Sequence, residues 1–136
     1  SEGTKAVDEA IKFLKSTPKL EPFQYSTALA KPAKLQLADL MENYSLGHTG
    51  KDGSSIPKRV ARFGKVGKLG GENIMNTFSN PREIVMHLII DDGLKGRGHR
   101  KNIFNKIFKL VGIAFGYGQK NDPITVMVFA DSFVEK

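Results

Sequence analysis

Apolar residues recur at helical spacing through the first third of the chain. In Ala6–Lys15 and again in Ser26–Tyr44 they fall three or four positions apart, which places them on one face of an α-helix. Pro32 interrupts the second pattern. Proline has no amide donor and kinks a helix interior, so the sequence leaves open a later start near Lys31, with Pro32 in the first turn.

Two further helices are predicted in the middle of the chain. Ile56–Phe63 carries a proline at a position suited to a first helical turn, followed by basic and apolar residues. Asn80 and Pro81 are a typical helix start, since asparagine caps free amides and proline fits the first position. The apolar pattern from Arg82–Asp91 continues this helix, and Gly93 is expected to stop it.

The remaining apolar runs have β character. Leu110–Tyr117 and Ile124–Asp131 are rich in β-branched and aromatic residues and are joined by a turn-forming stretch, so they predict an antiparallel hairpin with both faces largely covered. Glu72–Met75 is a candidate short strand, whereas Ile103–Lys109 fits either a helical turn or a loop. Helices followed by a late hairpin indicate an α+β fold with helices packed on a sheet.

Length and composition indicate one soluble globular domain over residues 1–136. No apolar run approaches the roughly 20 residues that a transmembrane helix needs. The chain has no cysteine, which excludes disulfides, thiolate nucleophiles and thiolate metal sites. It begins with Ser1 and shows no signal-peptide pattern, so we expect a processed or trimmed form.

The net charge is +7, and the positive side chains are concentrated in two clusters. Such clusters are typical either of solvated faces or of a surface for polyanions. The first cluster comprises Lys58, Arg59, Arg62, Lys65 and Lys68, and the second comprises Lys95, Arg97, Arg100, Lys101, Lys106 and Lys109.

Candidate chemistry is concentrated in four short segments, most of them flanked by glycine. They contribute His48, Glu72, Asp91 with its neighbour Asp92, and His99. Brought together, these side chains would form an imidazole and carboxylate cluster able to bind a divalent metal or to move protons. The separations are long, so spacing alone does not identify a compact zinc motif.

Other catalytic arrangements are missing from the sequence. There is no G-x-S-x-G motif and no cysteine nucleophile. The segment 96–99 is not a phosphate loop, because it lacks the later glycine and the lysine–hydroxyl pair. The third histidine, His87, lies in an apolar stretch and is interpreted as a core or edge residue.

Taken in order, these segments resemble the CAP superfamily, which includes cysteine-rich secretory proteins, antigen 5, plant pathogenesis-related proteins and bacterial SCP-like extracellular domains. The similarity runs from about Ala6 to Phe133 and is closest to the bacterial branch. It is carried by Gly47-His48, Gly71-Glu72-Asn73-Ile74, a helix ending in an acid, Gly98-His99-Arg100-Lys101-Asn102-Ile103, and Val111-Gly112-Ile113-Ala114.

The resemblance implies an α-β-α sandwich with helices on both sides of a mainly antiparallel sheet. It also implies a central cleft holding two histidines and two acids, which match His48, His99, Glu72 and Asp91, with Asp92 a close competitor. The chain departs from the family in having no cysteine and no tryptophan. Its fourth acid is an aspartate where glutamate is usual, so that carboxylate reaches less far.

The resemblance implies a secreted, extracellular or periplasmic binding module. Expected ligands are a divalent cation, zinc first, held by His48 and His99 with Glu72 and Asp91 as further candidates, or a sterol, fatty acid or other small molecule. One alternative is a metal- or His/Glu-dependent, protease-like hydrolase using the same four residues, although binding is favoured over catalysis. Another is a basic protein that binds an anionic surface or glycan; nucleic acid is not expected as a partner.

Overall fold

A four-stranded sheet forms the centre of the molecule. The structure is a computed structural model and describes residues 1–136. The strand order is β1-β4-β5-β3; β3, β4 and β5 pair antiparallel, and β1 adds two residues parallel to the edge of β4. The bounds are β1 Gln24–Tyr25, β3 Gly70–Met75, β4 Leu110–Tyr117 and β5 Pro123–Ala130.

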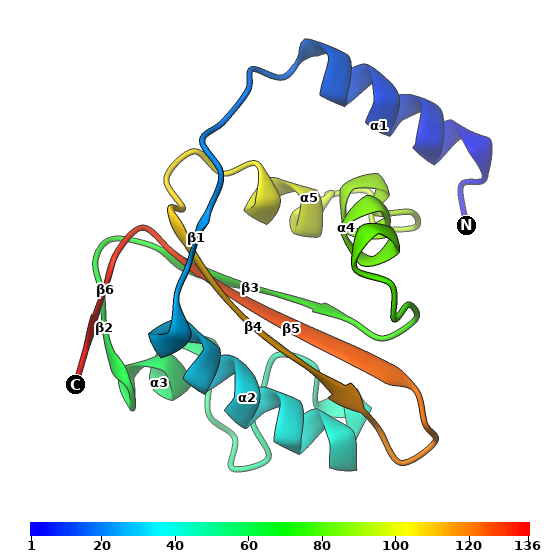
Figure 1. Ribbon diagram of the computed structural model, residues 1–136. Helices are drawn as coiled ribbons and strands as arrows, with labels where there is room; N and C mark the ends of the chain where they lie inside the picture. The colour runs from blue at the N-terminus through cyan, green and yellow to red at the C-terminus, as the bar shows by residue number, and fades with distance from the viewer.

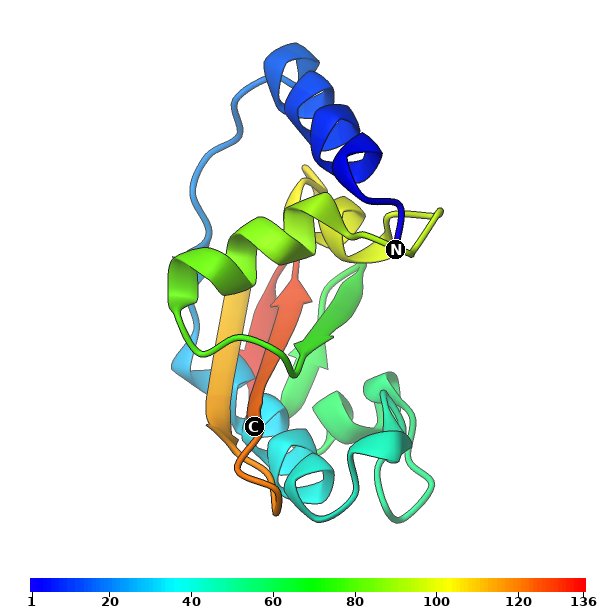
Figure 2. The ribbon, with the colours of Figure 1, turned by 90° about the vertical axis from the view of Figure 1, so that its right-hand side faces the viewer.

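Helices cover both faces of this sheet (Figures 1 and 2). On one face lie α2 (Thr27–Glu42) and the short α3 (Ile56–Ala61). On the other lie α4 (Pro81–Ile90) and α5 (Gly98–Ile103), and α1 (Thr4–Ser16) packs against α4 from outside. This arrangement confirms the expected α-β-α sandwich with a mainly antiparallel sheet.

Strand β5 separates two hydrophobic cores. Its residues Ile124, Val126 and Val128 face the core beneath α2, whereas Met127 and Phe129 face the core beneath α4. Alternate side chains of a strand point to opposite faces, and here both faces are covered, so every residue of the strand except Thr125 is apolar. This confirms the predicted hairpin with covered faces.

Close contact between α2 and β4 depends on a glycine. A Cβ atom at Gly112 would lie 2.2 Å from backbone atoms of Leu29 and Ala30 in α2. Only glycine permits this approach. The helix can therefore lie directly on the strand and bury Leu29 and Ala33 completely.

Helix α2 starts earlier than Lys31, the later start that Pro32 left open. It begins at Thr27, Ser26 caps it by accepting from the Leu29 amide at 3.1 Å, and Pro32 lies inside it. A start near Lys31 is therefore wrong. Pro32 is itself buried, as are its helix neighbours Leu29, Ala30 and Ala33, and this burial offsets the missing amide donor.

The helix predicted from Asn80 is confirmed: the Asn80 side chain accepts from two amides of the first turn, and Pro81 is its first residue. The ambiguous segment after Ile103 is loop, because α5 ends there. The candidate strand at Glu72–Met75 is real and begins earlier, at Gly70. His87 is half-buried and stacks on Phe78 with ring centroids 4.0 Å apart.

Three short strands were not predicted. Besides β1, they are β2 (Gly64–Val66) and β6 (Phe133–Glu135), which pair with each other in a separate two-stranded sheet. They are too short for a periodic pattern to reveal. No helix in the structure combines the length and apolar character required to cross a membrane.

Candidate functional site

Three predicted site residues, His48, Glu72 and His99, line a cavity of about 470 Å³. It lies where the start of β3 meets α5 and the loop that precedes α5. Its walls are formed by ten residues: His48, Glu72, residues 93–99 and Asn102. Three of the four predicted residues therefore line one cavity, although His48 and His99 are 51 positions apart in the sequence.

His48 and Glu72 form the first corner of the cavity. His48 follows a short 3₁₀ turn, η1 (Tyr44–Leu46), and its side chain is half exposed. Glu72 comes from β3 and its side chain is fully buried. The Nδ1 atom of His48 lies 2.8 Å from Oε1 of Glu72, so the carboxylate fixes the orientation of the ring.

Arg59 holds this corner in place from α3. Its guanidinium donates from Nη1 to Oε2 of Glu72 and from Nη2 to the His48 carbonyl, at 2.8 Å for the latter. Gln36 of α2 adds two bonds from Nε2, to the carbonyls of Gly47 at 2.6 Å and Thr49 at 3.1 Å. Arg59 and Gln36 are almost completely buried. The loop that carries His48 is thus fixed on both sides of the histidine.

Asp91 and His99 form the second corner. Asp91 ends α4 in the left-handed conformation, with φ 54°, and is buried. Its carboxylate accepts from the His99 backbone amide at 3.0 Å and contacts His99 Nδ1 at 2.8 Å. Asp92 instead accepts from the Glu2 amide and the Ser1 hydroxyl. The structure therefore places Asp91, not Asp92, beside the second histidine.

An ionic cluster supports the second corner from outside. Arg97 donates to both carboxylate oxygens of Glu2, at 2.7 and 3.0 Å, and to Glu9 at 2.9 Å, while Arg100 donates to Glu9 at 2.6 Å. Arg97 also donates to the Asp91 carbonyl at 2.7 Å. These bonds join α1 to the loop that forms the cavity wall.

The cluster shifts the acidity of its carboxyl groups. Hydrogen bonds from Arg97, then the Gly93 amide, lower the pKa of Glu2 to about 2, against some opposition from desolvation. The pKa of Glu9 is lowered mainly by the hydrogen bond from Arg100 and next by that from Arg97. Both carboxylates therefore stay charged well into the acid range.

Two asparagines connect the corners. Asn73, the residue after Glu72, donates to the His99 carbonyl at 3.0 Å. Asn102 donates to the Glu72 carbonyl at 3.2 Å and to Oδ1 of Asn73 at 2.8 Å. The backbone of each corner is thus tied to the other through this pair of side-chain amides.

Our sequence analysis missed four of these supporting residues. Asn73 and Asn102 stand inside the segments that carry the family resemblance, so their position was a usable signal. Arg59 was grouped with surface charges in the first basic cluster, whereas its side chain is 1% exposed. Nothing in the local pattern distinguishes Gln36 from other helix positions.

The geometry defines what the two imidazoles can offer. An ionised carboxylate only accepts, so each Nδ1 carries the proton and a neutral ring presents the lone pair of Nε2. Neither Nε2 has a hydrogen-bond partner in the protein. Metal-binding histidines are commonly oriented in this way by a carboxylate. No three or more His, Cys, Asp or Glu side chains are arranged as a group that could hold a metal ion.

Comparison with known proteins identifies the family of the chain. Residues 14–129 match the CAP family, described as the cysteine-rich secretory protein family. The chain belongs to the CAP family. It is also similar to the uncharacterized protein YkwD of Bacillus subtilis (strain 168), with 29% identity over 96 residues, or 71% of this chain. The CAP domain described here spans only 35% of the length of that relative.

Two solved structures share the fold of this CAP domain. An outer surface protein from Borrelia burgdorferi superposes with a TM-score of 0.67 at 19% identity, covering 98% of this chain and 89% of the other. An extracellular protein containing an SCP domain from Bacillus anthracis str. Ames gives 0.62 at 20% identity, covering 93% and 39% respectively. At this level of identity the likeness concerns the fold alone.

Proposed function

We propose that this chain is an extracellular CAP domain that binds a divalent cation in the cavity between His48 and His99, and zinc is the cation we expect. The observation that carries the proposal is the matched pair of histidine–carboxylate contacts, each 2.8 Å from Nδ1. The secretory description of the family supports the location, and so do the outer-surface and extracellular descriptions of its structural neighbours. Finding the native protein only in the cytoplasmic fraction would contradict the location.

The Nε2 atoms of His48 and His99 would hold the ion. Glu72 and Asp91 would orient the rings without binding metal themselves, because their oxygens already accept from Arg59, His48 and His99. Two protein ligands leave coordination positions for water or a ligand atom. A bound ion would supply a positive charge able to attract an anionic or carbonyl oxygen into the cavity.

We favour binding over hydrolysis because the carboxylates of Glu72 and Asp91 are buried and already paired. A general base must reach a water molecule or substrate proton directly. Glu72 is fully buried and occupied by Arg59 and His48, and Asp91 is buried and occupied by His99. No serine, threonine or cysteine lines the cavity, and neither acid is free to activate water, so we favour a ligand site over a reaction centre.

Calorimetric titration with zinc chloride tests the proposal. We expect saturable binding to the parent protein that is abolished in His48→Ala and in His99→Ala. His87→Ala is the matched control, because His87 lies on α4 and contacts Phe78. Coordination needs neutral imidazole, so binding should weaken as acid protonates the rings. Equal binding by the parent protein and both site variants would overturn the proposal.

A second candidate is a fatty acid bound between α1 and α4. A groove of about 700 Å³ there has eight apolar residues among its ten, and Arg82 could pair with a carboxylate. Val7, Ile11, Leu14, Val85 and Met86 are each at least 40% exposed in it. An exposed apolar surface of this kind often marks a binding site.

Binding of palmitate separates the two candidates. Val85→Glu, in the groove, should abolish palmitate binding without altering zinc binding. Val134→Glu is the control, because Val134 is 73% exposed on β6, away from the groove. Equal loss in both variants, or no palmitate binding by the parent protein, would exclude the groove as a fatty-acid site.

A further inference from the structure

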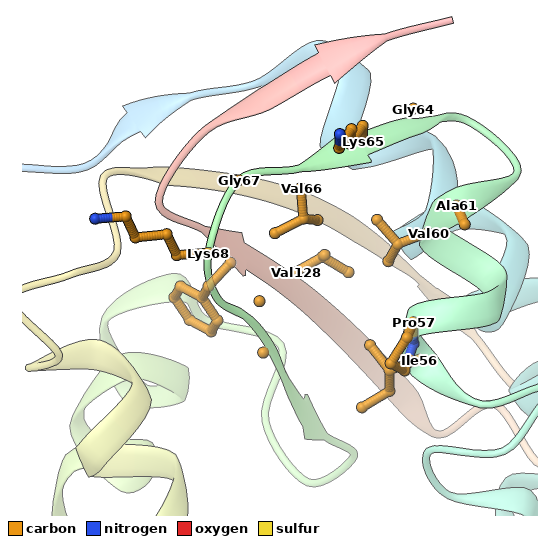
Figure 3. Close-up of a pocket in the computed structure, with 13 residues that line it drawn as sticks. Ile56, Pro57, Val60, Ala61, Gly64, Lys65, Val66, Gly67, Lys68 and Val128 are labelled. Carbon is orange, nitrogen blue, oxygen red and sulfur yellow. The ribbon is translucent and has the colours of Figure 1, made fainter.

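A second cavity lies away from the histidines, between α3, β2 and the beginning of β3. Its volume is about 510 Å³, within the range of small-molecule sites. Figure 3 shows Val60 of α3, Val66 of β2 and Val128 of β5 coming together on its inner side, with Ile56 and Pro57 at one end. None of its lining residues lines the histidine cavity or the α1–α4 groove.

The charged side chains that line this cavity are both basic, although the carboxylate of Asp131 lies beside the rim and accepts from the Lys68 backbone amide. Its only charged lining residues are Lys65 and Lys68, both exposed, and neither ammonium forms a salt bridge. The nearby Arg62, in contrast, is paired with Asp52. Lys68 extends outward at the rim in Figure 3, and its long, flexible side chain can turn toward a bound anion.

These residues account for part of the first basic cluster of the sequence. A surface that binds polyanions by charge alone needs no apolar depression. Here unpaired lysines stand beside a pocket walled by valine, isoleucine and phenylalanine. An apolar ligand without charge would leave the lysines unused, and a small anion without an apolar body would leave the pocket unfilled.

We infer that this cavity binds a compact amphipathic carboxylate. Its apolar body fills the space between Val60, Val66 and Val128, and its carboxylate pairs with Lys65 and Lys68 at the rim. The inference does not depend on the histidine site or on the α1–α4 groove, since the three share no residue.

Amide chemical-shift mapping of the whole chain with octanoate as the probe tests the inference. We expect saturable shifts at Val60, Gly64 and Val66. Octanol, which lacks the charge, and acetate, which lacks the apolar body, should each bind more weakly by about fivefold or more. Shifts confined to α1 and α4 would place octanoate in the other groove and overturn the inference, as would equal affinity for octanol.

Matched variants sharpen the test. Replacing both Lys65 and Lys68 by Met removes the charges and keeps most of each side chain, and should weaken octanoate binding about fivefold. The control replaces both Lys34 and Lys120 by Met; these lysines are exposed and line none of the three sites. Equal loss in both double variants would mean that net charge alone is responsible and would overturn the inference.

Ala61→Phe addresses the apolar half of the site. Ala61 lines the cavity but is exposed at the end of α3, so a larger side chain narrows the pocket without entering a core. Octanoate binding should be lost while the circular dichroism spectrum stays that of the parent protein. Unchanged octanoate affinity in this variant would contradict the inference.

Discussion

The two corners of the histidine cavity have the same inner geometry and different support. In each, a carboxylate oxygen lies 2.8 Å from Nδ1 of a histidine. Glu72 belongs to a sheet strand and is paired with Arg59 in the interior. Asp91 lies only eight positions before its histidine, in a loop supported by the outer ion pairs of Arg97.

The two histidines are therefore oriented by carboxylates that are held in place in two different ways. The Glu72 corner is held by buried charges, so its support is inseparable from folding of the sheet and α3. The Asp91 corner is held by local backbone conformation and by partly exposed ion pairs, which solvent and salt weaken. Disruption of the first should cost stability, whereas disruption of the second should alter the site and leave the fold.

The largest effect is expected at Arg59. Arg59→Ala leaves the Glu72 carboxylate buried without its cationic partner, which should lower the free energy of unfolding by about 3–5 kcal/mol in urea denaturation. The exposed pair Lys51–Glu42 is the control, and Glu42→Ala should cost no more than about 1 kcal/mol. Equal, small losses in both variants would show that the Glu72 corner is not held by its buried pair.

The link between the corners comes next in size. Asn73→Ala removes the partner of Asn102 and of the His99 carbonyl, so we expect a loss of about 1–3 kcal/mol. The imidazole NMR signals of both His48 and His99 should shift. Asn76→Ala, whose side chain bonds only Thr77, should stay within about 0.5 kcal/mol of the parent. A shift of only one histidine would contradict the link.

Neutralising the acids compares the corners directly, on the basis of the proposed zinc site. Asp91→Asn should weaken zinc binding about 10–100-fold with little loss of stability, because only one of the two oxygens that accept from His99 remains and the negative charge beside the ring is lost. Glu72→Gln should weaken zinc binding similarly and also destabilise the fold, because Arg59 loses its charged partner. Asp92→Asn should leave zinc affinity unchanged. Reduced stability in Asp91→Asn equal to that in Glu72→Gln would remove the distinction between the corners.

The smallest effect concerns the outer cluster and pH. The pKa of Glu2 is about 2 in the folded chain against an ordinary value of 4.5. Because the folded pKa is depressed, its stabilising contribution is complete above about 4.5 and is lost as the pH falls toward 2. The Gly93 amide donates to Glu2, so its NMR shift should titrate near pH 2. In Arg97→Gln the midpoint should rise, although the Gly93 amide still lowers the pKa of Glu2 in that variant. A midpoint near 4.5 in the parent protein would contradict this support.

Local sequence was sufficient to predict an element whose start or turn is set by residues within the element itself. Asn80 and Pro81 begin a helix because the cap and the first-turn proline act within a few residues, and the hairpin followed from two apolar runs around a turn. Pro32 shows where this approach fails. It is buried inside α2, and α2 packs on β4 and β5, which come much later in the chain. The short strands β2 and β6 carry no pattern and depend on each other.

The sequence by itself determined the residue types of the site and their order, because His48, Glu72, Asp91 and His99 stand in segments that resemble one family. Only the tertiary structure decided which of Asp91 and Asp92 lies beside His99. Asp91 takes the left-handed conformation at the end of α4, so its carboxylate faces His99, whereas the carboxylate of Asp92 faces the N-terminal segment. It also decided that Arg59 is an interior partner of Glu72. Burial and pairing arise from contacts between distant segments, which residue spacing does not encode.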